Sequence, residues 1–181
     1  MGTTSVGRTV FEIEEGEVRL VSKNERIEKH GDEGVLACDL GFVWETDNGV
    51  LACFSPTLKA ALYEKSGQGE LVDDPGHVTH LRFPQLGMVT WGGGEIVGAR
   101  VVFHQATGKK SEVALEGVKV NKFKLECKEG GTVAVHFRVQ ISPLEEHLSG
   151  KLSKFLAQEL CTVSVTPPAA SEEAGAGSPL H

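Results

Sequence analysis

The chain has 181 residues, of which 40% are hydrophobic and 24% charged, and its formal net charge is −7 at pH 7. This composition is that of an ordinary globular protein, and no apolar run is long enough to cross a bilayer. The N-terminus lacks the apolar core of a signal peptide and misses the myristoylation pattern. These features predict a cytoplasmic protein that makes no membrane contact.

The length favours one domain. We expect a single β-rich domain over residues 1–166, with a subdivision near the polar loop at 66–76 as the alternative. The segment 167–181 is too small and polar in composition to fold alone, which predicts a disordered tail.

In the first third of the chain, alternating apolar residues predict strands at 17–27 and 35–44, joined by the loop EKHGDEG. The second of these strands has one apolar face, formed by Leu36, Cys38, Leu40, Phe42 and Trp44. A further strand is predicted at 50–54. Ser55 and Pro56 then predict the N-cap and the first residue of a short helix. The inner side of that helix would hold Leu58, Ala61 and Leu62.

Short strands are predicted at 78–83 and 88–91, and a hairpin is predicted from 97–104 and 112–115. The run Gly92-Gly93-Gly94 is interpreted as a flexible turn, because it lacks the phosphate-loop pattern and no helix follows it. The middle of the chain is therefore expected to add antiparallel strands and no nucleotide-binding loop.

The segment 118–141 predicts a long β-hairpin. Apolar residues alternate strictly along its outgoing strand, at Val133, Val135, Phe137, Val139 and Ile141. A three-residue loop at 129–131, in which glycine supplies a left-handed residue, pairs Leu125 with Val135. A two-residue loop would pair Leu125 with Ala134 and place the two apolar sets on opposite faces, so the longer loop is favoured.

The incoming strand of this hairpin changes its apolar phase partway along. Val118 and Val120 are in one phase and Phe123 is in the other. An extra residue on one strand of an antiparallel pair produces such a change. We therefore predict a β-bulge at Asn121-Lys122.

After the hairpin, Ser142, Pro143 and Glu145 predict a helix start with a capping box. One apolar stripe runs along this helix, formed by Leu144, Leu148, Leu152, Phe155 and Leu156. A last strand is predicted at 160–166, with Cys161, Val163 and Val165 inward. About ten strand segments and two helices predict a mainly β, α+β fold. Its architecture would be an antiparallel sheet or β-sandwich with the two helices packed on it.

The cysteines form no Cys-x-x-Cys pair, and three of them share the parity of the apolar residues on their strands. The four are Cys38, Cys53, Cys127 and Cys161. Reduced core thiols are the expected state. No cofactor is predicted.

Charge is distributed unevenly along the chain. Residues 96–140 carry eight basic and four acidic side chains, a net charge of +4, whereas residues 1–95 have a net charge of −8. The outer face of the hairpin is the predicted nucleic-acid-binding surface, formed by Lys119, Lys122, Lys124, Lys128, His136 and Arg138. The alternative is an ordinary solvated face of a sheet. The hairpin phenylalanines fall in the inward phase, so no base-stacking platform is visible.

Two polar clusters could hold a metal or act in catalysis, and each is also ordinary turn chemistry. The first comprises Glu28, His30, Asp32 and Glu33, and the second comprises Asp73, Asp74, His77 and His80. The pattern leaves metal binding open at both. No nucleophile elbow, metalloprotease helix or dinucleotide fingerprint is present. We expect no metal, no catalytic residue and no enzymatic activity.

Several segments, in order, resemble a family of small tailed-phage and prophage proteins. They are RIEKHGDEGVLACDL, FSPTLKAALYEK, LVDDPGHVTHLRFPQLG, VNKFKLECKEGGTVAVHFRVQ and LAQELCTVSVTPP. The resemblance covers about residues 17–168 and implies an early-region phage protein in the cytoplasm of a bacterial host, near recombination and replication functions. It carries no catalytic or ligand residue onto this chain.

Three functions follow from these patterns. The leading one is a non-catalytic phage accessory protein of DNA recombination or replication, whose basic hairpin face binds single-stranded nucleic acid or a nucleic-acid enzyme. The second is an anti-defence inhibitor that binds a host bacterial protein complex through the acidic first half. The third is an enzyme that uses the 73–80 cluster. Sheet edges leave a homo-oligomer as a further option.

Overall fold

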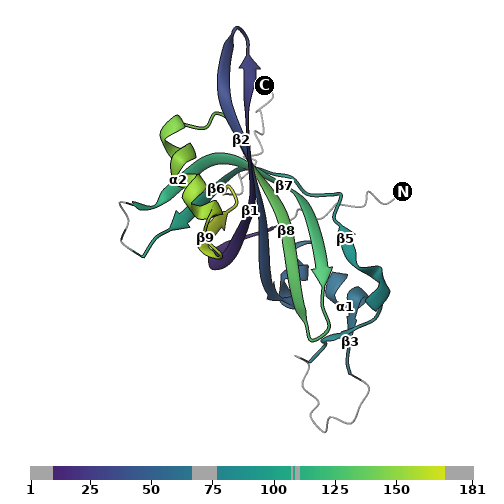
Figure 1. Cartoon of the computed structure of the whole chain (residues 1–181). Helices are drawn as coiled ribbons and strands as arrows, with labels where there is room; N and C mark the ends of the chain where they lie inside the picture. The colour runs from purple at the N-terminus through teal and green to yellow at the C-terminus, as the bar shows by residue number, and fades with distance from the viewer. Residues whose placement is uncertain (1–9, 67–76, 107, 109–110, 170–181) are drawn as a thin grey trace, which may run out of the picture.

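The computed structural model describes residues 10–66, 77–106, 108 and 111–169. Strands dominate this part of the chain, as Figure 1 shows. The strands are β1 (Ile13–His30), β2 (Glu33–Asp47), β3 (Tyr63–Glu64), β4 (His80–Leu81), β5 (Met88–Thr90), β6 (Ile96–His104), β7 (Val113–Cys127), β8 (Thr132–Ile141) and β9 (Cys161–Thr166). The helical segments are η1 (Asn48–Cys53), α1 (Leu58–Leu62), η2 (Pro84–Leu86) and α2 (Glu146–Leu156).

The main sheet is antiparallel and closed. Its strand order among the described residues is β5-β7-β6-β9-β1-β2-β8, and a further pairing of β7 with β8 joins the two sides into a barrel. The predicted mainly β, α+β class is confirmed. Of the two predicted architectures, the antiparallel sheet is confirmed, and it closes into a barrel because the long strand β7 pairs with β6 along its first half and with β8 along its second.

The β7–β8 hairpin has the predicted register. Leu125 lies opposite Val135, and the backbone N–H of Lys128 donates to the carbonyl of Thr132 at 2.8 Å, which leaves a three-residue loop. The glycines of that loop adopt left-handed φ angles of 94° and 91°. The register shifts between Asn121 and Lys124, so the predicted bulge is confirmed too.

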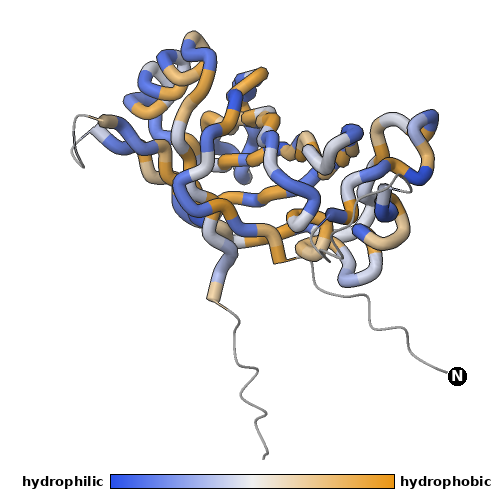
Figure 2. The backbone as a smooth tube through the Cα atoms, turned by 90° about the horizontal axis from the view of Figure 1, so that it is seen from below, coloured by the Kyte–Doolittle hydropathy of each residue, from blue (hydrophilic) through white to orange (hydrophobic). Residues whose placement is uncertain are grey.

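Aromatic rings fill the barrel from one end to the other. Neighbouring rings have centroids 4.7 to 5.8 Å apart along a chain that runs Trp91, Phe54, Phe123, Phe11, Phe137, Phe42, Phe103, Phe155. Phe123 and Phe137 are 0% and 3% exposed, which confirms their inward phase. Figure 2 shows hydrophobic and hydrophilic residues alternating along the backbone of the strands.

The β1–β2 hairpin is longer than its neighbours, and its tip projects beyond the barrel in Figure 1. Helix α2 packs beside β1. Lys23 of β1 donates to the hydroxyl of Ser149 on α2 at 3.0 Å, and the N–H of Leu144 donates to the carbonyl of Leu36 at 2.7 Å. Phe155 attaches the helix to the core by its ring contact with Phe103.

Four local predictions are wrong. The predicted loop EKHGDEG is mostly strand, because β1 runs to His30 and β2 begins at Glu33. Residues 50–53 belong to the 3-10 helix η1, where the Asp47 carboxylate accepts from the N–H of Gly49 at 2.7 Å, so the chain turns instead of extending. Helix α1 begins after Thr57 rather than at Pro56. Helix α2 has Glu145 at its N-cap without a side-chain cap, because the Ser142 hydroxyl donates to Glu28 instead.

Two of the predictions cannot be followed in full. The tail prediction concerns 167–181, of which 170–181 lie outside the described residues. Asp73 and Asp74 lie outside them as well. In the part of the chain that is described, no helix combines the length and apolar character needed to cross a membrane.

Candidate nucleic-acid interface

The outer face of the hairpin lies beside strand β2, which runs antiparallel to β8. Glu45 is opposite Ala134, and Asp39 is opposite Gln140. Both carboxylates therefore point to the same face as the basic residues of the hairpin. The predicted surface receives negative charge from a strand that is almost a hundred residues away in sequence.

Two predicted binding residues are paired with these carboxylates. Lys128 Nζ lies 2.5 Å from Glu45 Oε1, and Arg138 lies 3.7 Å from Asp39 Oδ2. The hydrogen bond from Lys128 lowers the pKa of Glu45. Both cations are only partly exposed, and their positive charge is partly neutralised by these carboxylates.

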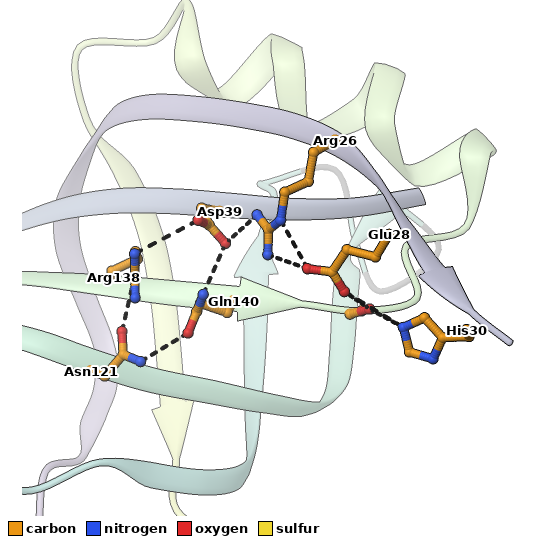
Figure 3. A network of polar contacts seen from close by, with 8 residues as sticks. Arg26, Glu28, His30, Asp39, Asn121, Arg138 and Gln140 are labelled. Atoms are coloured by element: carbon orange, nitrogen blue, oxygen red, sulfur yellow. Dashed lines mark hydrogen bonds and ion pairs between the residues drawn. The ribbon is translucent and has the colours of Figure 1, made fainter. Parts of the chain in front are cut away.

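A polar network surrounds Arg138, and Figure 3 shows it. Arg138 Nε donates to Asn121 Oδ1 at 3.0 Å, and Asn121 donates to Gln140 Oε1 at 2.9 Å. Gln140 in turn donates to Asp39 at 3.3 Å. Asn121 is buried, so its amide group is committed to these partners and to Glu95. The network locks β2, β8 and the β7 bulge together.

The same network continues onto strand β1 of the β1–β2 hairpin (Figure 3). Arg26 lies 2.8 Å from Asp39 Oδ1 and 2.6 Å from Glu28 Oε1. Ser142 donates to the other oxygen of Glu28 at 2.8 Å, and His30 lies 3.5 Å from it. The hydrogen bonds from Ser142 and Arg26 lower the pKa of Glu28. Glu28 is thus held by an arginine and a serine.

A pH-dependent stability follows from the lowered pKa of Glu28. A lowered folded-state pKa stabilises the fold above the ordinary value of 4.5, and this contribution disappears as the pH falls through the lowered value. We expect wild type to melt at a higher temperature than Glu28→Gln at about pH 6, and the difference to shrink toward about pH 3. Thermal unfolding followed by circular dichroism measures it.

Glu33→Gln is the matched control, because Glu33 is exposed at the tip of the same hairpin. Its melting temperature should track that of wild type across the series. A difference between wild type and Glu28→Gln that stays constant with pH would contradict the assignment.

Two further predicted binding residues also lie near carboxylates. Lys119 Nζ is 3.3 Å from Glu95 Oε1, and His136 Nε2 is 3.7 Å from Glu126 Oε2. The hydrogen bond from Asn121, and then that from Lys119, lowers the pKa of Glu95. The Nε2 atom of His136 is buried and makes no hydrogen bond within the described residues. Four of the six predicted residues therefore have an acidic neighbour.

Lys122 and Lys124 differ from the other four. Both are exposed, and neither has a carboxylate partner in the part of the chain that the structure describes. Lys122 occupies the β7 bulge with a φ of 57°, a left-handed conformation that glycine or asparagine adopts at lower cost. The basic surface of the hairpin thus reduces to two adjacent exposed ammonium groups.

Strand β5 is the neighbour of Lys124 on one side of β7. Thr90 of β5 lies opposite Lys124, and the N–H of Trp91 donates to the carbonyl of Phe123 at 2.9 Å. Trp91 is half-buried at the end of the aromatic chain, and the exposed residues 92–94 follow it. Strand β5 therefore runs beside Lys124, while the Trp91 ring packs against Phe54 at the core.

His80 is the member of the second polar cluster whose side-chain partner is described. It is exposed, and its Nδ1 lies 2.9 Å from Glu129 Oε1 at the β7–β8 loop. The N–H of Leu81 donates to the same carboxylate at 3.1 Å, and these bonds lower the pKa of Glu129. His80 thus fastens a loop. Among the described residues, no three metal-ligating side chains come together.

All four thiols are free, and two of them, Cys38 and Cys161, are fully buried. Burial raises the pKa of every cysteine, Cys53 and Cys127 included. The prediction of unpaired, packed thiols is confirmed. A raised pKa leaves little thiolate for nucleophilic chemistry.

The fold and this surface define a small antiparallel β-barrel with aromatic rings in its interior, ion pairs on the outer face of the hairpin and, at the β7 bulge, the exposed Lys122 and Lys124. No protein-family model, curated protein or solved structure matches the chain. The resemblance to phage proteins stays a prediction.

Proposed function

We propose that this protein binds single-stranded nucleic acid through Lys122 and Lys124, as an accessory factor of phage DNA recombination or replication. The observation that carries the proposal is the backbone of Lys122. A lysine in the left-handed region costs about 1 to 2 kcal/mol relative to an ordinary conformation. Strained residues gather at functional sites, where the gain lies in what the side chain contacts.

The electrostatics around the pair suit a polyanion, despite the net charge of −7. Screening limits charge interactions to about 10 Å at 0.1 M salt, so distant carboxylates contribute little. Near the pair, Glu126 faces His136, and Glu95 faces Lys119. The two uncompensated cations are left to attract phosphates.

The salt dependence of binding tests the proposal quantitatively. Two phosphate contacts to a single strand give a slope of about −1.4 in log K against log salt, because each contact contributes about −0.7. Affinity for a fluorescein-labelled oligothymidylate of about 16 nucleotides should fall about sevenfold between about 50 and 200 mM salt. Fluorescence anisotropy measures it. Absence of binding at the lower salt concentration would refute the proposal.

Replacing Lys122 by glycine should act in opposite directions on stability and on binding. Glycine relieves the left-handed strain, and the variant is expected to gain about 1 kcal/mol in free energy of unfolding. It also removes one ammonium group, which should lower the salt slope by about 0.7. Urea denaturation and the anisotropy assay provide the two readouts. A variant that is less stable than wild type would contradict the assignment of strain to the backbone of Lys122.

A second candidate is an inhibitor that binds a host protein, and the free edge of the sheet favours it. Phe83, Leu86 and Met88 are 60%, 53% and 46% exposed, and they lie within six residues of the chain that lead into strand β5, which ends the strand order. Changing all three to serine should leave oligonucleotide binding intact and abolish relief of host restriction in a plating assay. Unchanged plating would reject this candidate.

A further inference from the structure

A chain of three polar side chains lies on the outer face of β6 and β9. Ser164 of β9 is opposite Val102, and His104 lies two residues further along β6 on the same face. Glu112 precedes β7 and faces His104 across the β6–β7 turn. His104 Nε2 lies 2.7 Å from Ser164 Oγ, and His104 Nδ1 lies 3.2 Å from Glu112 Oε1.

The backbone N–H of Glu15 donates to Ser164 Oγ at 3.0 Å. An ionised Glu112 carboxylate can only accept, so a neutral His104 carries its proton on Nδ1 and its Nε2 accepts from the serine hydroxyl. This is the connectivity of a serine nucleophile, a histidine base and an orienting carboxylate.

Ser164 also faces open space. An open cleft of about 470 Å³ is lined by Glu12, Ile13, Glu14, Glu15, Ser164 and Thr166. Glu15, which supplies the N–H, has a left-handed φ of 45° at a register shift of β1. The alternative is that His104 and Ser164 form an ordinary diagonal contact on a sheet surface, which would require neither the cleft nor the strained backbone of Glu15.

We propose that Ser164 is an activated nucleophile that accepts the acyl group of a cationic carboxylic ester, with His104 as general base and Glu112 as its positioning residue. The class of substrate follows from the cleft. Three glutamates on its wall favour a positive charge on the ligand. The N–H of Glu15 points at Oγ itself rather than at the place of a substrate oxyanion, so stabilisation of the tetrahedral intermediate is weak and the reactive ester is favoured over the amide.

The step balances without any added redox partner. Ser164 Oγ attacks the ester carbonyl while its proton moves to His104 Nε2. The tetrahedral intermediate collapses, its C–O bond to the alcohol breaks, and the alcohol leaves with the proton from His104. Water, deprotonated by His104, then hydrolyses the acyl-serine and regenerates the hydroxyl. With this weak stabilisation of the intermediate, the acyl-serine is expected to form slowly and to be detectable by mass spectrometry.

A fluorophosphonate probe tests the nucleophile in the full chain. We expect one phosphonyl group per chain, located on Ser164 by peptide mass spectrometry, and no labelling of Ser164→Ala. Ser153→Ala, which alters a serine on α2, is the control and should be labelled as wild type is. His104→Gln should label about 100-fold more slowly, the usual contribution of a general base.

Three outcomes would overturn the proposal. One is labelling that persists in Ser164→Ala, and another is the absence of labelling in folded wild type. The third is a His104→Gln variant that reacts at the wild-type rate with an unchanged circular dichroism spectrum.

Glu112→Gln should lower the limiting rate of labelling at saturating probe without changing the probe concentration that gives half of that rate.

The charge of the cleft is tested separately with acetylcholine. The double variant Glu12→Gln and Glu14→Gln should accumulate acetyl-serine more slowly than wild type, while its circular dichroism spectrum stays that of wild type. Equal acetylation of both proteins would reject the cationic ester as the substrate class. These readouts do not involve Lys122 or nucleic acid, so they stand apart from the oligonucleotide assay.

Discussion

Reversing both charges in a Lys122→Glu, Lys124→Glu variant is expected to weaken single-strand binding about 100-fold at about 50 mM salt. A charge-assisted hydrogen bond contributes about 1.5 kcal/mol, and two of them correspond to about a hundredfold in affinity. Both side chains are exposed, so the fold should tolerate the change. Anisotropy with labelled oligothymidylate measures the loss.

The control reverses two lysines elsewhere on the surface. Lys151 and Lys154 are exposed on α2, so Lys151→Glu with Lys154→Glu makes the same change in net charge. This variant should bind within about threefold of wild type, because salt screens the charges on α2 from nucleic acid bound at Lys122 and Lys124. Equal losses in the two double variants would mean that net charge, and not the bulge, governs binding.

A Phe42→Ala variant is expected to lose about 3 to 5 kcal/mol of free energy of unfolding. Phe42 is 1% exposed and stacks on Phe137 with centroids 5.1 Å apart and an interplanar angle of 11°. Its ring also lies 5.8 Å from that of Phe103. Deletion would interrupt the aromatic chain at its middle. Urea denaturation at equilibrium measures the change.

Phe83→Ala makes the same chemical change at a ring that is 60% exposed. Its loss should stay below about 1 kcal/mol, because little apolar area leaves the interior. If Phe42→Ala does not fold, Phe42→Leu should still show a loss of about 1 to 2 kcal/mol. Similar losses at positions 42 and 83 would contradict the placement of the core.

Alternation was sufficient to predict the central hairpin, including its loop length. The reason is that a shift of one residue would turn Phe137 and Val135 into water, so only one register satisfies both strands. The bulge was equally predictable, since Val120 and Phe123 cannot both face inward on an unbroken strand. The predicted start of the last helix was wrong because Ser142 had a competing acceptor in Glu28, which lies 114 positions away.

The candidate surface was only half predictable. The exposed Lys122 and Lys124 follow from the local pattern. Asp39 forms ion pairs with Arg26 and Arg138. It occupies an outward position in the otherwise apolar strand 35–44, and a lone carboxylate there was the available signal for a partner on the neighbouring strands. No spacing connects Ser164 with His104, because the two residues meet only when β9 pairs with β6.

The sequence by itself determined a β-rich chain, the inward face of each long strand, the hairpin register and the basic segment, because each depends on neighbours within a few residues. Tertiary structure alone decided that the sheet closes into a barrel, which lysines keep an uncompensated charge, and where a serine, a histidine and a glutamate line up. Those outcomes depend on which strands lie side by side. Such pairing is set by the packing of the whole core rather than by local alternation.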